Sequence, residues 1–186
     1  MATSQQEFER VALVHLDRVY QLAVWLCGNR AEAEDLVQET YLRAFRHFDQ
    51  FDPGTNCRAW LFAIARNTFV NQVKREGREL LQLEEGGMEQ REAESSEVMV
   101  AIADPEEEFF KHTMDSDLVS ALEGLPLRFR EAVLLAEVEE CSYKEIAKIC
   151  GLPLGTVMSR LYRGRRLLRK ALVAAGRERR GARRET

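Results

Sequence analysis

The 186-residue sequence lacks any apolar run that approaches the roughly 20 residues needed to span a membrane. Its first residues, MATSQQEFER, are polar and acidic from the start, so we expect no secretory signal there. We therefore expect a cytoplasmic protein that is not inserted in a membrane.

Cysteine is scarce, and its spacing fits neither a metal site nor a disulfide framework. Cys27, Cys57, Cys141 and Cys150 form no C-x-x-C pair, and no histidine lies at zinc-ligand spacing from them. In the cytoplasm we expect reduced thiols, with Cys150 facing the core, and a redox-sensing pair is the alternative. We predict no metal site and no cofactor.

Motifs of catalysis are missing as well. The sequence contains no G-x-S-x-G, no P-loop, no H-E-x-x-H and no convincing pair of catalytic carboxylates. A helical hydrolase or transferase is therefore the weaker alternative, and we predict a protein without catalytic residues.

The net charge of −4 hides a strong asymmetry along the chain. Residues 76–109 hold twelve acids and two arginines, a net charge of −10, whereas residues 160–186 hold eleven basic residues and two glutamates, a net charge of +9. This contrast indicates two different surfaces, one of them suited to phosphates. A solvated acidic linker and a merely soluble basic tail are the alternative interpretation.

Apolar residues recur at helical spacing almost everywhere and no alternating strand pattern persists, so the sequence predicts an all-α fold. One helix is expected to begin at a capping box at Ser4 and to end at Gly28. A second begins at Asn29, and a third covers about 58–76 after the loop DQFDPGTN, whose Pro-Gly pair is a turn signal.

The segment YKEIAKICGLPLGTVMSRLYRGRRLL predicts a helix-turn-helix. A capping box from Ser142 to Glu145 starts one helix, and Gly151 can take the left-handed conformation that ends it. Pro153 cannot continue that helix but suits the start of the next one. In this motif the second helix enters the DNA major groove. An ordinary amphipathic bundle helix is the alternative.

The second helix of this motif has two contrasting sides at about 100° per residue. Its packed side is expected to contain Val157, Leu161, Gly164 and Leu168. Its opposite side carries Gly155, Ser159, Tyr162, Arg163 and Arg166, with Met158 and Arg165 at the edges. Arginine can bridge phosphates or guanine edges, and Met or Tyr can touch a thymine methyl group.

The helix that begins at Asn29 also has a core side and a polar side. The core side is expected to contain Leu36, Val37, Thr40, Tyr41, Ala44, Phe45 and Phe48. The opposite side holds Asp35, Gln38, Glu39, Leu42 and Arg46, with Arg43 alongside. An exposed leucine among charges of both signs suits a protein partner, although isolated surface leucines are common.

In the third helix, Asn67, Asn71, Lys74 and Arg75 follow the apolar block and suit base edges and phosphates. Phe48, Phe51 and Trp60 could stack on unpaired bases, but for Phe48 and Trp60 we favour a place in the core.

Three segments carry a resemblance to a known family, the group-four, extracytoplasmic-function (ECF) type bacterial sigma factors. AEDLVQETYLRAFRHF resembles the family's polymerase-binding helix, and RAWLFAIARNTFVNQVKR resembles its promoter-melting helix. The helix-turn-helix segment resembles the family's C-terminal helix-turn-helix. The resemblance covers nearly the whole chain except the acidic segment and the extreme tail. It implies sigma region 2 at 1–76, a flexible acidic linker at 77–114, sigma region 4 at 115–175 and a basic tail at 176–186.

The resemblance also implies partners and site residues. Core RNA polymerase would be bound through the β′ clamp by Asp35, Gln38, Glu39, Leu42, Arg43 and Arg46, and through the β flap by region 4. The promoter −10 element, where the family extrudes a base, would be handled by His47, Phe51, Asn56, Asn67, Asn71, Lys74 and Arg75. The −35 element would be read by Thr156, Met158, Ser159, Tyr162, Arg163 and Arg166. Met158 departs from the lysine or arginine often found at that position.

The segment GTVMSRLYRGRRLL, preceded by YKEIA, further resembles the sequences of one branch of the family, which is controlled by zinc-containing, thiol-sensitive anti-sigma factors. This implies an anti-sigma partner and a role in a stress response. Two other functions stay open: an ordinary helix-turn-helix regulator that acts without polymerase, and a helical protein-interaction adaptor.

Overall fold

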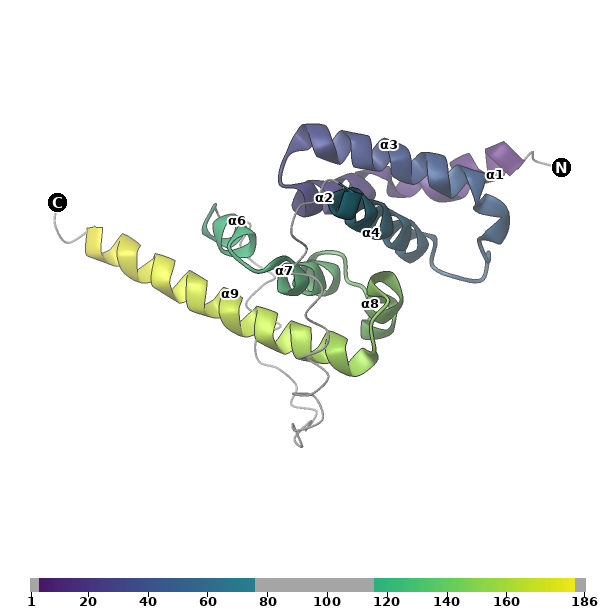
Figure 1. Ribbon diagram of the computed structural model, residues 1–186. Helices are drawn as coiled ribbons and strands as arrows, with labels where there is room; N and C mark the ends of the chain where they lie inside the picture. The colour runs from purple at the N-terminus through teal and green to yellow at the C-terminus, as the bar shows by residue number, and fades with distance from the viewer. Residues whose placement is uncertain (1–3, 76–115, 183–186) are drawn as a thin grey trace. The chain divides into compact units, whose positions relative to one another are not determined.

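Helices account for all the regular secondary structure in the computed structural model, which describes residues 4–75 and 116–182 (Figure 1). The all-α prediction is therefore confirmed for these residues. The predicted linker at 77–114 lies outside them. The chain divides into two compact units, the first with α1 to α4 and α8, the second with α6, α7 and α9. The domain boundaries expected from the sequence stay predictions.

The first unit begins with a helix that is interrupted, not continuous as expected. Its elements are α1 (Ser4–Ala12), a 3₁₀ turn (Leu13–His15), α2 (Leu16–Cys27), α3 (Arg30–Arg46), a second 3₁₀ turn (Phe48–Gln50) and α4 (Cys57–Arg75). The interruption coincides with a tertiary contact, because the Tyr41 hydroxyl donates a hydrogen bond of 3.1 Å to the carbonyl oxygen of Ala12. Burial raises the pKa of Tyr41 to about 12.

The ends of these helices follow the sequence signals. Gly28 closes α2 in the left-handed conformation with φ of 76°, a backbone geometry that glycine adopts without strain. The Asn29 side chain accepts a 2.8 Å hydrogen bond from the backbone N–H of Glu32 and so caps α3. The two helices therefore reverse direction over a very short connection.

Helices α2, α3 and α4 pack against one another through apolar side chains. The buried residues of this core include Val19, Leu22, Leu26, Leu36, Val37, Leu61, Phe62 and Phe69. Most of the core side expected for α3 is indeed buried, but Phe45 is 47% exposed, so its assignment to the core was wrong. Its ring still packs edge-on against Phe8, with ring centroids 5.2 Å apart, and the rest of it faces solvent because it lies at the end of α3.

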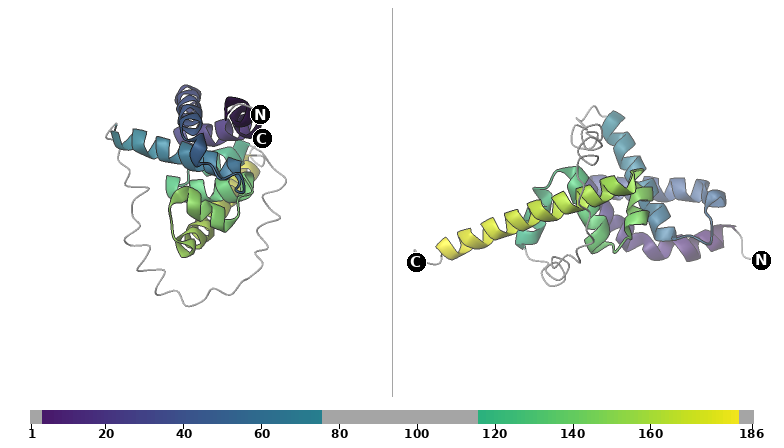
Figure 2. Two further views of the ribbon diagram at one scale, coloured as in Figure 1. Left: turned by 90° about the vertical axis from the view of Figure 1, so that its right-hand side faces the viewer. Right: turned by 90° about the horizontal axis from the view of Figure 1, so that it is seen from below.

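The second unit is organised by one long helix. It consists of α6 (Ser116–Glu123), α7 (Leu127–Val133), a π-helical turn (Leu134–Val138) and α9 (Leu154–Ala182), whose 29 residues pack against α6 and α7. Figures 1 and 2 show α9 continuing past α6 and α7 toward the C-terminus. The expected domain end at 175 thus falls inside a helix.

Candidate nucleic-acid interface

The turn before α9 has the geometry that the sequence predicted. Helix α8 (Tyr143–Cys150) starts with a complete capping box, in which the Ser142 hydroxyl accepts from the Glu145 backbone N–H and the Glu145 carboxylate accepts from the Ser142 backbone N–H. The Glu145 carboxylate also accepts a 2.8 Å hydrogen bond from the Ser142 hydroxyl, and the two hydrogen bonds it accepts from Ser142 hold the pKa of Glu145 below its ordinary value. Gly151 ends α8 with φ of 65°, and α9 begins directly after Pro153.

One side of α9 is packed, as predicted. Val157, Leu161, Gly164 and Leu168 are all buried. The closest approach is at Gly164, where an added Cβ would lie 2.7 Å from Val133 Cγ2 and 3.2 Å from the carbonyl oxygen of Phe129. Only a residue without a side chain allows α7 and α9 to come this near, so Gly164 fixes how α9 sits in its unit.

The opposite side of α9 contains most of the residues assigned to the −35 element. Tyr162 is 65% exposed and Arg166 is exposed, while Met158, Ser159 and Arg163 are half-buried. Thr156 is buried instead, because it lies four residues before the buried Arg160 and so shares its side of α9. Gly155 is exposed, and a Cβ added there would have no neighbour within 4 Å among the described residues.

Arg165 requires a correction, since it was expected at the edge of the exposed side. Its Nε and Nη2 atoms donate hydrogen bonds of 2.9 and 2.5 Å to Oε1 of Glu137 in the π-helical turn. The two side chains are only 9% and 14% exposed. The spacing already contained this signal, because residue 165 is four residues after Leu161 and three before Leu168. Arg160 was missed as well: it is only 2% exposed and lies three residues after Val157 and four before Gly164, on the packed side.

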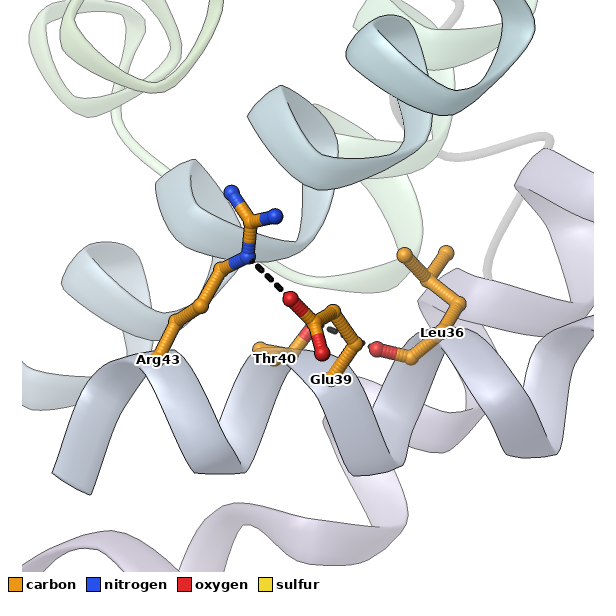
Figure 3. Close-up of polar contacts among 4 residues, drawn as sticks. All are labelled: Leu36, Glu39, Thr40 and Arg43. Atoms are coloured by element: carbon orange, nitrogen blue, oxygen red, sulfur yellow. Dashed lines mark hydrogen bonds and ion pairs between the residues drawn. The ribbon is translucent and has the colours of Figure 1, made fainter. Parts of the chain in front are cut away.

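In the first unit, the predicted polymerase surface lies along α3. Asp35, Gln38, Leu42 and Arg46 are exposed, and the Leu42 side chain reaches 52% exposure, as its position opposite the core side implied. Glu39 and Arg43 are joined by an ion pair with Arg43 Nε 2.6 Å from Glu39 Oε1 (Figure 3). Between them, the buried Thr40 hydroxyl turns to the helix backbone and donates to the Leu36 carbonyl oxygen at 2.6 Å.

A cavity of about 450 Å³ lies between the end of α3 and the middle of α4. It is lined by Glu39, Arg43, Arg46, His47, Gln50, Trp60, Ile64, Asn67 and Thr68. It therefore brings together members of the polymerase set and the −10 set. Sequence reasoning missed Gln50, Ile64 and Thr68, although residues 60, 64, 67 and 68 share one face at helical spacing.

The remaining residues assigned to the −10 element are distributed around this cavity. Asn71, Lys74 and Arg75 are exposed on the last turns of α4. Asn56 is exposed and caps α4, because its Oδ1 accepts from the Ala59 backbone N–H at 3.3 Å. His47 lies at the end of α3, and its Nδ1 is 3.3 Å from Gln50 Nε2.

Phe51 is the one −10 candidate that is buried, at 8% exposure. Its ring is stacked on Phe48 at 5.8 Å between centroids and lies 5.1 Å from the centroid of Trp60. The hydrophobic gain of burying these rings together favours a structural cluster over a free stacking platform. Placing Phe48 and Trp60 in the core agrees with this cluster, although both keep partial exposure.

The described residues contain neither a group of three or more His, Cys, Asp or Glu side chains that could hold a metal ion nor a helix long and apolar enough to cross a membrane. Three of the cysteines are buried, including Cys150, and burial raises the pKa of the Cys57 thiol to about 11. A thiol with a pKa in this range is poorly reactive at neutral pH.

Helix α8 ends at a left-handed glycine, and α9, which follows Pro153, keeps Tyr162 and Arg166 exposed, a local pattern that matches the helix-turn-helix of DNA-binding proteins. The family models described as Sigma-70 region 2 and Sigma-70, region 4 match residues 13–79 and 116–168. The chain is 42% identical over 159 residues to the ECF RNA polymerase sigma factor SigE of Mycolicibacterium smegmatis, covering 86% of this chain and 59% of that relative. It is 31% identical over 169 residues to the ECF RNA polymerase sigma factor SigW of Bacillus subtilis, covering 90% of each chain.

A solved structure agrees with these matches. The sigma factor RpoE from Bartonella quintana, in complex with the anti-sigma factor NepR, is similar with a TM-score of 0.66 and 32% identity, over 89% of this chain and 96% of that chain. The chain belongs to the ECF family of RNA polymerase sigma factors. It is therefore a transcription initiation factor that binds core RNA polymerase and directs initiation at promoters.

Proposed function

We propose that α9 reads the −35 element in duplex DNA while the first unit binds core polymerase and handles the −10 element. The observation that carries the proposal is the two-sided nature of α9. Its Val157, Leu161, Gly164 and Leu168 side is buried, which leaves Tyr162 and Arg166 exposed on the other side. Ser159, Tyr162 and Arg163 are assigned to base edges, and Arg166 to phosphate.

We assign the exposed part of α3, centred on Leu42 with Asp35 and Gln38, to the clamp of the polymerase β′ subunit. A leucine exposed to this degree among charged neighbours suits an anchor in a protein interface. The polar residues of α4, which are Asn67, Asn71, Lys74 and Arg75, are assigned to the −10 element. The second unit is assigned to the β flap. Domain limits of 1–76 and 115–175 belong to this proposal.

In-vitro transcription with purified core polymerase on a library of promoters tests the function. Run-off products that require this protein are expected, and they should weaken when Tyr162→Ala and Arg166→Ala are introduced into α9. Arg10→Ala, which removes an exposed arginine of α1, is the matched control and should transcribe normally. If the α9 variants gave the same run-off products from every promoter as the wild type, the assignment of α9 to the −35 element would be contradicted.

A second candidate is a helix-turn-helix regulator that binds operators without polymerase. This function explains the arrangement of α8 and α9, but it does not explain why Leu42 is exposed among charged residues on α3. Co-purification separates the two functions, because only a sigma factor forms a stoichiometric complex with core polymerase that Leu42→Asp disrupts.

We further propose that an anti-sigma factor holds the free chain, and that this partner contains zinc and responds to thiol oxidation. The RpoE–NepR complex supports an anti-sigma partner, because its sigma subunit is similar to this chain. The sequence of α8 and α9, which resembles the branch controlled by zinc-containing anti-sigma factors, supports the role of zinc and thiols. Pull-down from the native host under reducing conditions should recover the partner with zinc. Treatment with a thiol oxidant should release the chain, whereas a complex unaffected by oxidant would exclude this branch.

The proposed activity is non-enzymatic and takes place in the cytoplasm. Bond formation belongs to the polymerase, and the chain contributes binding energy and DNA distortion. A purified chain that hydrolyses nucleotides or peptides in the absence of polymerase would contradict this part of the proposal.

A further inference from the structure

The exposed side of α9 can recognise bases only if the helix is held at a defined angle of rotation about its own axis. Tyr162 is exposed on that side, and Ser159 and Arg163 are half-buried beside it. Side chains end about 6 Å from a helix axis, so a rotation of about 20° displaces their tips by about 2 Å. A hydrogen bond to a base edge tolerates a displacement of about 0.5 Å, so such a rotation would break it.

Packing at the closest point between α9 and α7 does little to set this angle. Gly164 lies against Val133 and Phe129 of α7 at that point. Helices resist rotation where the side chains of one fit between those of the other, and glycine has no side chain to contribute. The close approach therefore sets the distance between the helices, whereas the angle needs a directional contact nearby.

The ion pair of Arg165 with Glu137 is a contact of this kind. Nε and Nη2 of Arg165 both donate to Oε1 of Glu137, at 2.9 and 2.5 Å, so the pair requires one orientation of the planar guanidinium group. The two side chains are 9% and 14% exposed, and salt therefore screens this pair much less than it screens a surface pair. Because Arg165 follows Gly164 directly in the chain, the contact acts on the turn of α9 where packing is least restrictive.

The backbone around Glu137 departs from regular helix in two places. Glu137 lies in the π-helical turn Leu134–Val138, in which the N–H of Glu139 donates to the Leu134 carbonyl oxygen at 3.0 Å. Glu140 has φ of 51°, in the left-handed region that residues other than glycine rarely adopt. Both departures cost free energy, and such features are frequent at functional sites. They are a second observation, independent of the ion pair, that the position of Glu137 serves more than stability.

Stability alone does not account for a buried ion pair. Replacing such a pair by apolar side chains of similar volume is often neutral or stabilising, because removing two charges from water costs free energy. An apolar pair of the same size would still hold α9 against the π-helical turn. It would also let the helix rotate, since the hydrophobic effect has no preferred direction.

We infer that Glu137 and Arg165 are positioning residues for recognition of the −35 element, because their ion pair fixes the rotation of α9 and thereby aims Tyr162 and its neighbours at the bases. The inference rests on the proposed function of α9 and deepens it, since neither residue itself contacts DNA in this mechanism. The pair acts on specificity, which depends on alignment with particular bases. It does not act on the general attraction of α9 for phosphates.

Binding of duplex DNA to the holoenzyme, formed from core polymerase and the full chain, tests the inference. Fluorescence anisotropy compares two duplexes: one carries the −35 element of a promoter that the wild type transcribes, and the other carries the same bases in scrambled order. The ratio of the two affinities measures specificity. Replacing Glu137 and Arg165 together by methionine should keep the urea unfolding midpoint of the chain close to that of the wild type. It should lower the ratio at least about five-fold, as the loss of one base contact does.

Three further variants separate positioning from charge and from stability. Arg165→Lys keeps the positive charge but loses the planar two-donor contact, so it should lower the ratio by a similar factor. Glu137→Gln keeps an oxygen that can accept both hydrogen bonds, so it should lower the ratio less than Arg165→Lys does. Glu123→Gln, which removes an exposed carboxylate of α6, is the matched control and should keep the wild-type ratio. For the scrambled duplex, the slope of log K against log salt should be unchanged in every variant, because the phosphate contacts remain.

A folded double methionine variant with the wild-type ratio would overturn the inference, and so would a folded Arg165→Lys variant with that ratio. If the methionine pair does not fold, Arg165→Lys decides alone. Equal losses of affinity for the two duplexes would also overturn the inference, because they leave the ratio unchanged. In all these cases the proposed function survives. A wild-type holoenzyme that binds the two duplexes equally would overturn the assignment of α9 to the −35 element, and this inference with it.

Discussion

Gly164→Ala is expected to destabilise the second unit, although the same change stabilises most helices. An added Cβ would lie 2.7 Å from Val133 Cγ2 and 3.2 Å from the Phe129 carbonyl oxygen, so both a branched core side chain and the backbone of α7 must move. Overpacking of this kind costs about 1–3 kcal/mol. Alanine recovers about 0.5–1 kcal/mol of helix propensity. From the midpoints of these two ranges, the net loss should be about 1 kcal/mol.

Gly176→Ala in the same helix is the matched control, because no described residue lies within 4 Å of a Cβ added there. This variant should be more stable than the wild type by up to about 1 kcal/mol. Urea unfolding followed by circular dichroism measures both changes. Trp25 and Trp60 lie in α2 and α4 of the first unit, so their fluorescence should give the same urea unfolding midpoint in the wild type and in both variants. A Gly164→Ala variant as stable as the wild type would refute the close approach of α7 and α9.

The other predictions concern an ion pair, a DNA contact, a cap and a phenol. Arg165→Ala should cost about 3 kcal/mol, because it leaves Glu137 buried without its cation, and replacing both residues by methionine should recover most of the loss. Arg163→Ala should weaken promoter binding by about 1–3 kcal/mol in a filter-binding assay with the holoenzyme. Asn29→Ala should lower the free energy of unfolding by about 1 kcal/mol, measured by urea titration. Stability should fall as pH rises from about 10 toward 12, because the pKa of Tyr41 is raised in the folded state and the unfolded chain ionises first.

Each of these expectations has an outcome that contradicts it. Equal losses for the single Arg165 variant and the double methionine variant would argue against a penalty from an unpaired carboxylate. Undiminished promoter binding by Arg163→Ala would favour the adaptor interpretation over DNA recognition. An Asn29→Ala variant as stable as the wild type would mean that the cap contributes nothing measurable. A phenylalanine at position 41 that leaves the alkaline loss of stability unchanged would assign that loss to other groups.

Local signals in the sequence were sufficient for the ends of several helices. Gly28, Asn29, Ser142 and Gly151 act on backbone groups within a few residues of themselves, so their effect does not depend on the rest of the fold. Helical periodicity was likewise sufficient for the buried stripe of α9. These features could be predicted because neighbours in sequence determine them.

Predictions failed where a distant residue decides the environment. Arg165 has the charge of a DNA contact, but it forms a mostly buried ion pair with Glu137, 28 residues earlier in the chain. Phe45 has the hydrophobicity of a core residue, but packing against Phe8 of α1 covers only part of its ring and leaves nearly half of the residue exposed. The break after Ala12 likewise coincides with a hydrogen bond from Tyr41, 29 residues away.

The sequence by itself determined that the chain is helical and that arginine and tyrosine share one side of α9. It also determined that α8 ends at Gly151 and that α9 begins directly after Pro153. Periodicity, capping and charge are properties of short segments, and they persist in any arrangement of those segments. Only the tertiary structure decided that α3 and α4 line an open depression, that Glu39 and Thr68 form part of its lining, and that Gly164 allows the close approach of α7 and α9. These depend on which faces meet in space, and packing of distant segments sets that choice.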